Sequence, residues 1–254
     1  MDDHDRRACG RHPVQLATER NAIEPAWSPD GRTISFLSNT EGSPTGNVWS
    51  QPADGSGMAR LMLASKRPLS EEVWLPSGTG LVVRTTTSTA GSGDLLATSS
   101  LSDTIATPIV ATKRAEYSPA VSPDGQWLAY SSDLTGRFEV YIVPRTAPAS
   151  TRVLVSTAGG SSPRWSADGR ALFYLTLETR LMEARISTAP TLRVDGMRTL
   201  FNASQFVQTS TSRRNYDVAP DGRFLFVRRS GDAQPSAMVV VEHFVDEVRG
   251  AVKR

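Results

Sequence analysis

The apolar and polar positions of this chain repeat with a period of about 45 residues. The clearest copy is Pro119–Tyr130, PAVSPDGQWLAY, in which a tight turn leads into a strand with alternating apolar residues. Comparable copies span 25–36, 163–174 and 216–227, and a worn copy spans 72–83. Self-similarity at this period predicts a propeller or another repeat array.

The centre of each copy is turn chemistry. In Ser-Pro-Asp-Gly, proline presets one turn position, aspartate bonds to the backbone that follows it, and glycine accepts a positive φ. The turn glycines stand 47, 47, 44 and 53 residues apart, at Gly31, Gly78, Gly125, Gly169 and Gly222. The turn aspartates are Asp30, Asp124, Asp168 and Asp221, and the worn copy has a serine in this place. We expect these aspartates and glycines to be structural.

After each turn, the third and fifth residues beyond the glycine are apolar, which is the alternation of a β-strand. These pairs are Ile34 and Phe36, Leu81 and Val83, Leu128 and Tyr130, Leu172 and Tyr174, and Leu225 and Val227. The residue between them is often apolar too, as expected for a sheet covered on both faces. Trp27, Trp74 and Trp165 occupy one slot before the turn, where we expect them to pack between sheets.

The spacing leaves room for four short strands per copy, which is typical of propeller blades. The sequence therefore predicts an all-β fold, a β-propeller of four-stranded blades, with five blades in this chain and a propeller domain over residues 13–243. The predicted blades lie near 25–65, 72–111, 119–157, 163–205 and 216–243. In the fourth, residues 191–201 are expected to form a longer connection. Residues 1–12 are predicted to be a disordered or partial-blade tail, and residues 244–254 a short amphipathic helix.

Two ring geometries fit this pattern. The fifth copy offers no fourth strand, whereas Val14–Thr18 reads as a spare strand near the N-terminus. Either this strand completes the fifth blade of a closed five-bladed ring, or the chain has lost an upstream blade. Of the two, we favour a truncated six-bladed ring.

Composition narrows the function. The 254 residues carry 28 basic and 26 acidic side chains, a net charge of +2, and the basic pairs are scattered over different copies, so nucleic acid is not an expected partner. One cysteine excludes an internal disulfide. No apolar run is long enough to span a bilayer, and residues 1–12 are too polar for a secretory signal. The chain as written is therefore expected to be soluble, without membrane insertion.

The repeat PxWSPDGxxIxFxS, followed by a third strand and an outer strand, resembles the TolB-like β-propeller repeat over residues 14–243. In that family the repeat occurs in periplasmic TolB, in the propellers of prolyl-oligopeptidase-type enzymes, and in the extracytoplasmic parts of bacterial receptor-like serine/threonine kinases. The tail Met238–Phe244 and the segment 245–254 resemble the end of the kinase-linked propellers, although the sequence has no kinase motif. The resemblance implies a periplasmic or extracytoplasmic location if the chain belongs to a larger protein, and a cytoplasmic one otherwise.

The sequence offers no convincing catalytic residue, cofactor site or metal site. It has no GxSxG elbow, and its histidines are His4, His12 and His243. Cys9 and His12 have a C-x2-H spacing but no second ligand cluster. The turn aspartates do not combine with the arginine cluster and tyrosine of a sialidase. We therefore predict a protein that is not an enzyme.

A binding role remains, at the segments that enter each innermost strand and line the mouth of the channel. The candidate rim residues are Glu24, Glu71, Glu72, Glu116, Tyr117, Ser161, Ser162, Arg213, Arg214, Asn215 and Tyr216. An acidic side from the first three copies would face a basic side from the fifth; the alternative is an ordinary set of hydrated loops. The leading hypothesis is a propeller that binds a protein or peptide, as the sensor or scaffold part of a receptor-like kinase or a truncated relative. The alternatives are a freestanding periplasmic envelope protein and a propeller attached to a peptidase or glycan-active enzyme.

Overall fold

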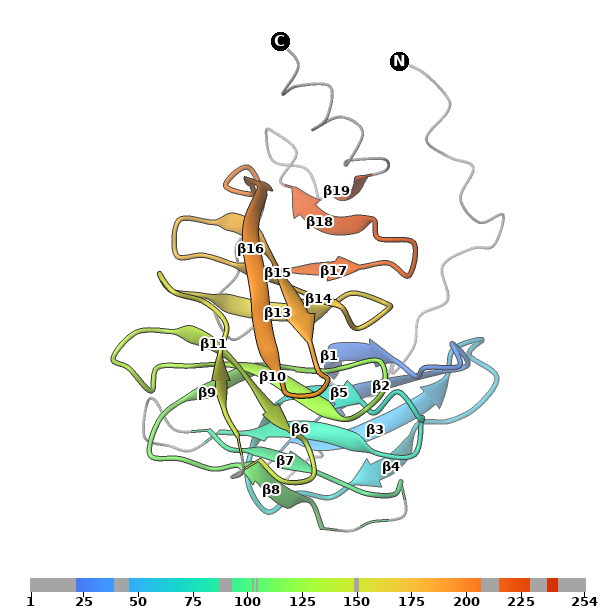
Figure 1. Cartoon of the computed structure of the whole chain (residues 1–254). Coiled ribbons are helices and arrows are strands. Elements are labelled where there is room, and N and C mark those ends of the chain that lie inside the picture. Colours follow the sequence, from blue (N-terminus) through green and yellow to red (C-terminus); the bar gives the residue numbers. More distant parts are fainter. Residues whose placement is uncertain are drawn as a thin grey trace, which may run out of the picture.

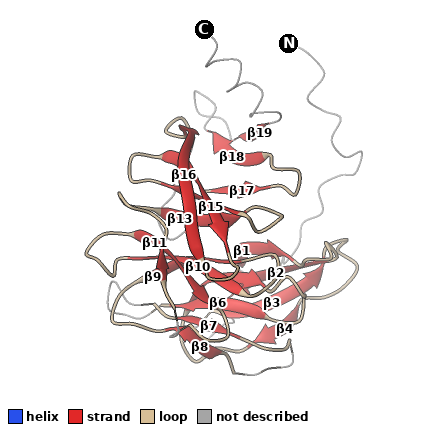
Figure 2. Cartoon of the chain, in the orientation of Figure 1, coloured by secondary structure: helices blue, strands red, loops and turns tan. Residues whose placement is uncertain are grey.

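The structure is a computed structural model that describes residues 22–38, 46–86, 93–101, 103, 105–148, 151–206 and 215–227, and the backbone of 228 and 237–241. Every regular element in these ranges is a β-strand (Figure 2). None of the described residues belongs to a helix that could cross a membrane. The predicted tail 1–12, the strand Val14–Thr18 and the helix 244–254 all lie outside the described residues.

The described residues form nineteen strands in five antiparallel sheets, each a simple meander in chain order. Blade 1 contains β1 (Ala22–Trp27), β2 (Thr33–Ser38), β3 (Asn47–Pro52) and β4 (Arg60–Leu63). Blade 2 contains β5 (Leu69–Trp74), β6 (Leu81–Thr85), β7 (Leu95–Ala97) and β8 (Thr107–Val110). Blade 3 contains β9 (Glu116–Val121), β10 (Trp127–Ser132), β11 (Glu139–Pro144) and β12 (Val153–Leu154).

Blade 4 contains β13 (Ser161–Trp165), β14 (Ala171–Leu175), β15 (Arg180–Ser187) and β16 (Arg193–Asn202). Blade 5 has three described strands, β17 (Tyr216–Val218), β18 (Phe224–Arg228) and β19 (Ala237–Val241). The all-β architecture of four-stranded blades is therefore as the repeats predict. In blade 4 the sequence interpretation was wrong in one respect, because most of the expected connection over 191–201 is the fourth strand, β16.

The blades follow one another in chain order, with blade 5 at the top of Figure 1, and neighbouring blades meet along their first strands, which are therefore innermost. Among the described strands, β1 contacts β5, β5 contacts β9, β9 contacts β13 and β13 contacts β17. No contact of comparable extent joins β17 back to β1 within the described strands. The described blades therefore form an open arc.

The core lies between the blades, in apolar layers that each combine the facing sides of two neighbours. Trp74 and Trp165 are buried in these layers. The indole N–H of Trp74 donates to Ser35 Oγ of the preceding blade at 2.8 Å, and that of Trp165 donates to the Ala120 carbonyl at 3.1 Å. Trp27 occupies the same slot in blade 1 but is 61 % exposed, so the expected packing fails there. The reason is that no described blade precedes blade 1.

The side chains of the Ser-Pro-Asp-Gly turns form hydrogen bonds within their own turns. Ser122 Oγ donates to Asp124 and accepts from the Trp127 N–H, while Asp124 also accepts from the Gln126 N–H at 3.0 Å. The turns of blades 1 and 4 repeat this network. The Ser28 hydroxyl and the Arg32 N–H hold the pKa of Asp30 below its usual value. These carboxylates have their hydrogen bonds inside their own turns.

Blade 5 departs from the predicted register. In blade 3 the backbone bond that closes the turn joins residues five apart, from the Ser122 N–H to the Trp127 carbonyl, and blades 1, 2 and 4 have the same spacing. In blade 5 the corresponding bond joins residues four apart, from the Ala219 N–H to the Arg223 carbonyl, so this turn is one residue shorter. A one-residue slip turns every side chain of a strand to the other face. Phe224 and Phe226 are consequently buried against blade 4, and Val227 is exposed. Leu225 and Val227 therefore do not face the preceding blade, as the corresponding apolar pairs of blades 2, 3 and 4 do.

Candidate functional site

The innermost strands are bulged at one repeated position. Glu24, Ser118 and Ser162, each followed by proline, have φ of 52°, 51° and 54°, a region that non-glycine residues seldom occupy. The pairing of each of these strands with its neighbour shifts register at the same place. A bulge of this kind re-aims the backbone and side chains around it. Here it directs the amide of Ser118 towards the preceding blade.

The carboxylate of Glu71 accepts hydrogen bonds from the Ser118 amide. Ser118 N–H donates to both of its oxygens, at 3.0 and 3.2 Å, so blade 3 is bound to the innermost strand of blade 2. The Glu71 carboxylate also lies 3.7 Å from Nε of Arg84, which projects from β6 of its own blade. Both side chains are almost fully buried.

Arg84 is held from several sides. Its Nε donates to the Glu116 carbonyl at 2.5 Å, and one Nη donates to Ser70 Oγ at 2.6 Å. Its guanidinium lies over the ring of Tyr117, 3.7 Å from the centroid, in a cation–π contact. The guanidinium is thus satisfied despite burial, and it ties β6 to the start of β9.

A second cation comes from the innermost strand of blade 4. Arg164 projects from β13, is 8 % exposed, and lies 3.9 Å from the exposed carboxylate of Asp217 on β17. Burial raises the pKa of Glu71, and the charge of Arg164 acts weakly in the opposite direction. We call Glu71, Arg84, Tyr117, Ser118 and Arg164 the axial cluster.

Blades 4 and 5 are joined at the bulge position as well. Asn215 Nδ2 donates to Ser162 Oγ at 3.3 Å, which links the same repeat slot in the two blades. Tyr216 follows Asn215 and stacks on Phe226, with the ring centroids 5.3 Å apart. Burial raises the pKa of Tyr216 well above its usual value. Its hydroxyl has no hydrogen-bond partner among the described residues.

Two carboxyl groups near the axis are strongly perturbed. Burial raises the pKa of Glu71 to about 7, against the opposing effects of Arg84 and the Ser118 amide. Burial also raises the pKa of Glu116 to about 7, with the Thr112 hydroxyl acting in the opposite direction. Such shifts accumulate at functional sites and also in structural ion-pair networks.

Most of the predicted rim residues lie on or beside the innermost strands and not in loops. Glu71, Glu72, Glu116, Asn215 and Tyr216 are buried, whereas Glu24 and Tyr117 are partly exposed. Ser161 and Ser162 are buried in β13. Arg213 and Arg214, the expected basic side, lie outside the described residues.

Sequence reasoning missed Arg84, Arg164 and Asp217. A signal existed for the two arginines. Arg84 interrupts an otherwise apolar strand, LVVRT, and Arg164 stands where blades 1 and 3 have Ala26 and Ala120. A charged residue in a position that is small and buried in two other copies indicates a special environment.

The described part of the chain contains no group of three or more histidine, cysteine, aspartate or glutamate side chains arranged to hold a metal. Cys9 and all three histidines lie outside it.

Comparison with known proteins gives the fold. No family model and no curated protein matches the sequence. TolB from Acinetobacter baumannii is similar in structure, with a TM-score of 0.63 and 14 % identity, over 89 % of this chain and 53 % of that one. A putative TolB from Agrobacterium tumefaciens has a TM-score of 0.61 and 19 % identity, over 79 % of this chain and 72 % of that one. The fold is a TolB-like β-propeller.

The same fold occurs in proteins with different activities. A puromycin-hydrolyzing peptidase from Mycobacterium tuberculosis matches with a TM-score of 0.61 and 14 % identity, over 89 % of this chain and 37 % of that one. The chain spans about half of the A. baumannii TolB and a smaller share of the peptidase. Because one fold hosts several functions, function has to be argued from the site.

Proposed function

We propose that this TolB-like propeller binds a segment of another protein at the axial cluster and does not catalyse a reaction. The observation that carries the proposal is the presence of a buried carboxyl group, Glu71 of blade 2, and a buried guanidinium group, Arg164 of blade 4, on the innermost strands of their blades. Such an arrangement can receive the backbone and charged side chains of an inserted peptide. The alternative role of the cluster is to join blades, which needs no ligand.

The surface around the cluster supports recognition. Tyr117 is partly exposed with its ring on Arg84, and Asp217 is exposed beside Arg164. A buried, hydrogen-bonded floor beneath exposed side chains is preorganised, which reduces the cost of ordering on binding. Aromatic and arginine side chains are also enriched where proteins bind each other.

The proposed context is the sensor or scaffold part of a larger extracytoplasmic protein, with a kinase-linked protein as the first candidate because of the tail resemblance. A freestanding envelope protein is the second candidate. A role beside a peptidase domain is the third, and the similarity to a peptidase supports it.

The test is affinity purification from native cells followed by quantitative mass spectrometry. The variants are Glu24→Arg and Asp217→Arg at the rim, with Asp54→Arg as a control, since Asp54 is an exposed acid in the turn at the opposite end of blade 1. We expect specific partners to fall at least tenfold with both rim variants and to stay with the control. Equal recovery with all three variants would contradict the proposal.

A further inference from the structure

Two pairs of basic residues, Lys66-Arg67 and Lys113-Arg114, occupy the same position in neighbouring repeats. They are 47 residues apart, which is also the spacing of the first three turn glycines. Each pair lies in the connection that leads from the outermost strand of one blade to the innermost strand of the next, which is β5 or β9. Both pairs therefore lie at the rim end of the blades, where the innermost strands begin.

Contacts with the rim end of blade 2 place the two pairs on either side of residues 93–94. Arg67 Nη1 donates to the Asp94 carboxylate at 2.6 Å. The Gly93 carbonyl accepts a hydrogen bond from the Glu116 N–H at 3.3 Å, two residues beyond Arg114. The two pairs therefore form one surface at the junction of blades 2 and 3, which we call the basic rim patch: Lys66, Arg67, Lys113 and Arg114.

Most of the positive charge of this patch is available to a ligand. Three of its side chains, all but that of Arg67, are exposed and form no hydrogen bond or ion pair with other described residues. Arg67 is paired with Asp94, yet its side chain remains 43 % exposed. Asp133, at the same end of blade 3, accepts a hydrogen bond from the Ala115 N–H at 3.0 Å. The nearby acids are therefore already engaged.

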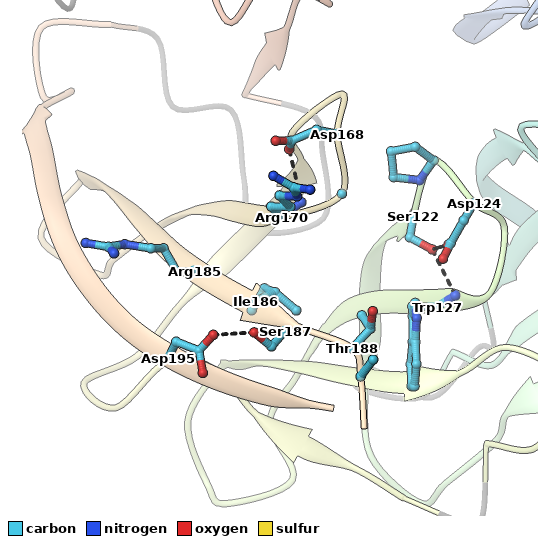
Figure 3. A pocket seen from close by; sticks show the side chains of 13 residues that line it. Ser122, Asp124, Trp127, Asp168, Arg170, Arg185, Ile186, Ser187, Thr188 and Asp195 are labelled. Atoms are coloured by element: carbon cyan, nitrogen blue, oxygen red, sulfur yellow. Dashed lines mark hydrogen bonds between the residues drawn. The ribbon is translucent and has the colours of Figure 1, made fainter. Parts of the chain in front are cut away.

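The large groove at the turn end of blades 3 and 4 has no such excess of one charge (Figure 3). Its volume is about 720 Å³, and its lining contains three aspartates and two arginines. Asp168 accepts a hydrogen bond from the Arg170 N–H at 3.0 Å, and Asp195 accepts one from the Ser187 hydroxyl (Figure 3). The mixed charge of the groove favours neither an acidic nor a basic ligand, whereas the basic rim patch favours an acidic one.

We propose that the basic rim patch binds an acidic stretch of the protein segment that occupies the axial cluster. The patch continues that cluster, because Arg114 lies three residues before Tyr117, whose ring carries the guanidinium of Arg84. Complementary charge steers the encounter of two proteins and fixes the register in which they bind. Arginine also pairs with a carboxylate through two parallel hydrogen bonds. The choice of a protein as the ligand rests on the proposed function, and the patch adds the charge that this ligand carries.

The test is fluorescence anisotropy with a fluorescein-labelled peptide of eight residues in which glutamate alternates with serine. Lysine replaces glutamate in the matched control peptide. We expect saturable binding of the glutamate peptide at low ionic strength and at least tenfold weaker binding of the lysine peptide. Because salt screens exposed charges, binding should also weaken at least tenfold between about 25 and about 300 mM salt. The paired substitution Lys113→Glu with Arg114→Glu should weaken binding at least tenfold.

The matched control is Arg32→Glu with Arg60→Glu, which changes the net charge equally at exposed positions of blade 1 outside the patch. Binding should change less than twofold with this pair. Because all four substituted side chains are exposed, both variants should keep the melting temperature of the native protein.

The lysines locate the contact, because the chain has three, Lys66, Lys113 and Lys253. Reductive methylation with ¹³C-formaldehyde labels lysines and keeps their charge. The methyl resonances of Lys66 and Lys113, assigned with Lys66→Arg and Lys113→Arg, should shift when the glutamate peptide binds and stay unchanged with the lysine peptide.

Equal weakening by both pairs of substitutions, unmoved resonances of Lys66 and Lys113, or no saturable binding of the glutamate peptide would overturn the proposal. Patch-dependent sedimentation of the protein with phosphatidylglycerol vesicles, without binding of the peptide, would overturn it as well, because the ligand would then be a membrane surface. Failure of the function proposed for the axial cluster is seen separately, as unchanged partner recovery with Glu24→Arg and Asp217→Arg, which leave the patch intact.

Discussion

The Glu71 carboxylate on blade 2 accepts two hydrogen bonds from the Ser118 amide on blade 3, and both groups are buried at the axis. The two residues are 47 positions apart, one repeat period, so each occupies the bulge slot of its own blade. The contact therefore joins two residues that occupy equivalent positions in neighbouring repeats. It also places a buried carboxyl group at the centre of the arc.

The first prediction concerns pH. Because burial raises the pKa of Glu71 from 4.5 to about 7, the folded protein binds this proton more tightly than the unfolded chain. The contribution of Glu71 to stability is therefore fully present below pH 4.5 and is lost as the pH rises through about 7. At 1.36 kcal/mol per pKa unit, the loss is on the order of 3 kcal/mol.

The Glu71→Gln variant lacks this titration. Its free energy of unfolding relative to the native protein should therefore rise between pH 5 and pH 8, which urea unfolding at the two pH values would measure. A difference between variant and native protein that is equal at both pH values would contradict the raised pKa of Glu71.

The second prediction compares tryptophans in one repeat slot. Trp74→Ala and Trp165→Ala should each destabilise the protein by about 3–5 kcal/mol, because a large buried side chain and a hydrogen bond to the preceding blade are lost. Trp27→Ala should cost less than about 1 kcal/mol, because that side chain is exposed. Thermal unfolding of the three variants provides the comparison, and an equal cost for Trp27→Ala would show that something covers blade 1.

The repeats give most of the architecture directly. Period, turn chemistry and strand alternation predict the blades, and they do so because each copy meets the same local physics. The features that the repeats could not predict depend on contacts between neighbouring blades. Trp27 looks like Trp74 in the sequence but has no described blade in front of it, and Arg164 meets Asp217 only because β13 packs beside β17. The slip in blade 5 likewise depends on a turn shorter by one residue, although its Pro-Asp-Gly is the same as in blades 1 and 3.

The third prediction tests that slip. Phe226 is fully buried among aromatic rings of blades 4 and 5, whereas Val227 is 37 % exposed. Phe226→Ala should therefore cost about 3–5 kcal/mol, and Val227→Ala no more than about 1 kcal/mol. Urea unfolding would measure both, and the reverse order of the two costs would restore the register that the sequence alone suggests.

The fourth prediction concerns the worn repeat. Its altered sequence suggests a weaker need for glycine at Gly78 than at Gly125, but both have φ of +71°. A β-branched residue is strained in this region whatever space surrounds it. Gly78→Val and Gly125→Val should therefore lower the melting temperature by similar amounts. A clearly smaller effect at Gly78 would mean that this turn can adopt another conformation.

The central claim is that the axial cluster is where a protein partner binds, and photo-crosslinking in native cells tests it most directly. A benzophenone amino acid is placed at Tyr117 on the rim or, as a control, at Asp54 in the turn at the opposite end of blade 1. The account predicts a discrete crosslinked band from position 117 that disappears with Asp217→Arg, and no such band from position 54. Crosslinks from position 54 alone, or a band from position 117 that is unaffected by Asp217→Arg, would contradict it.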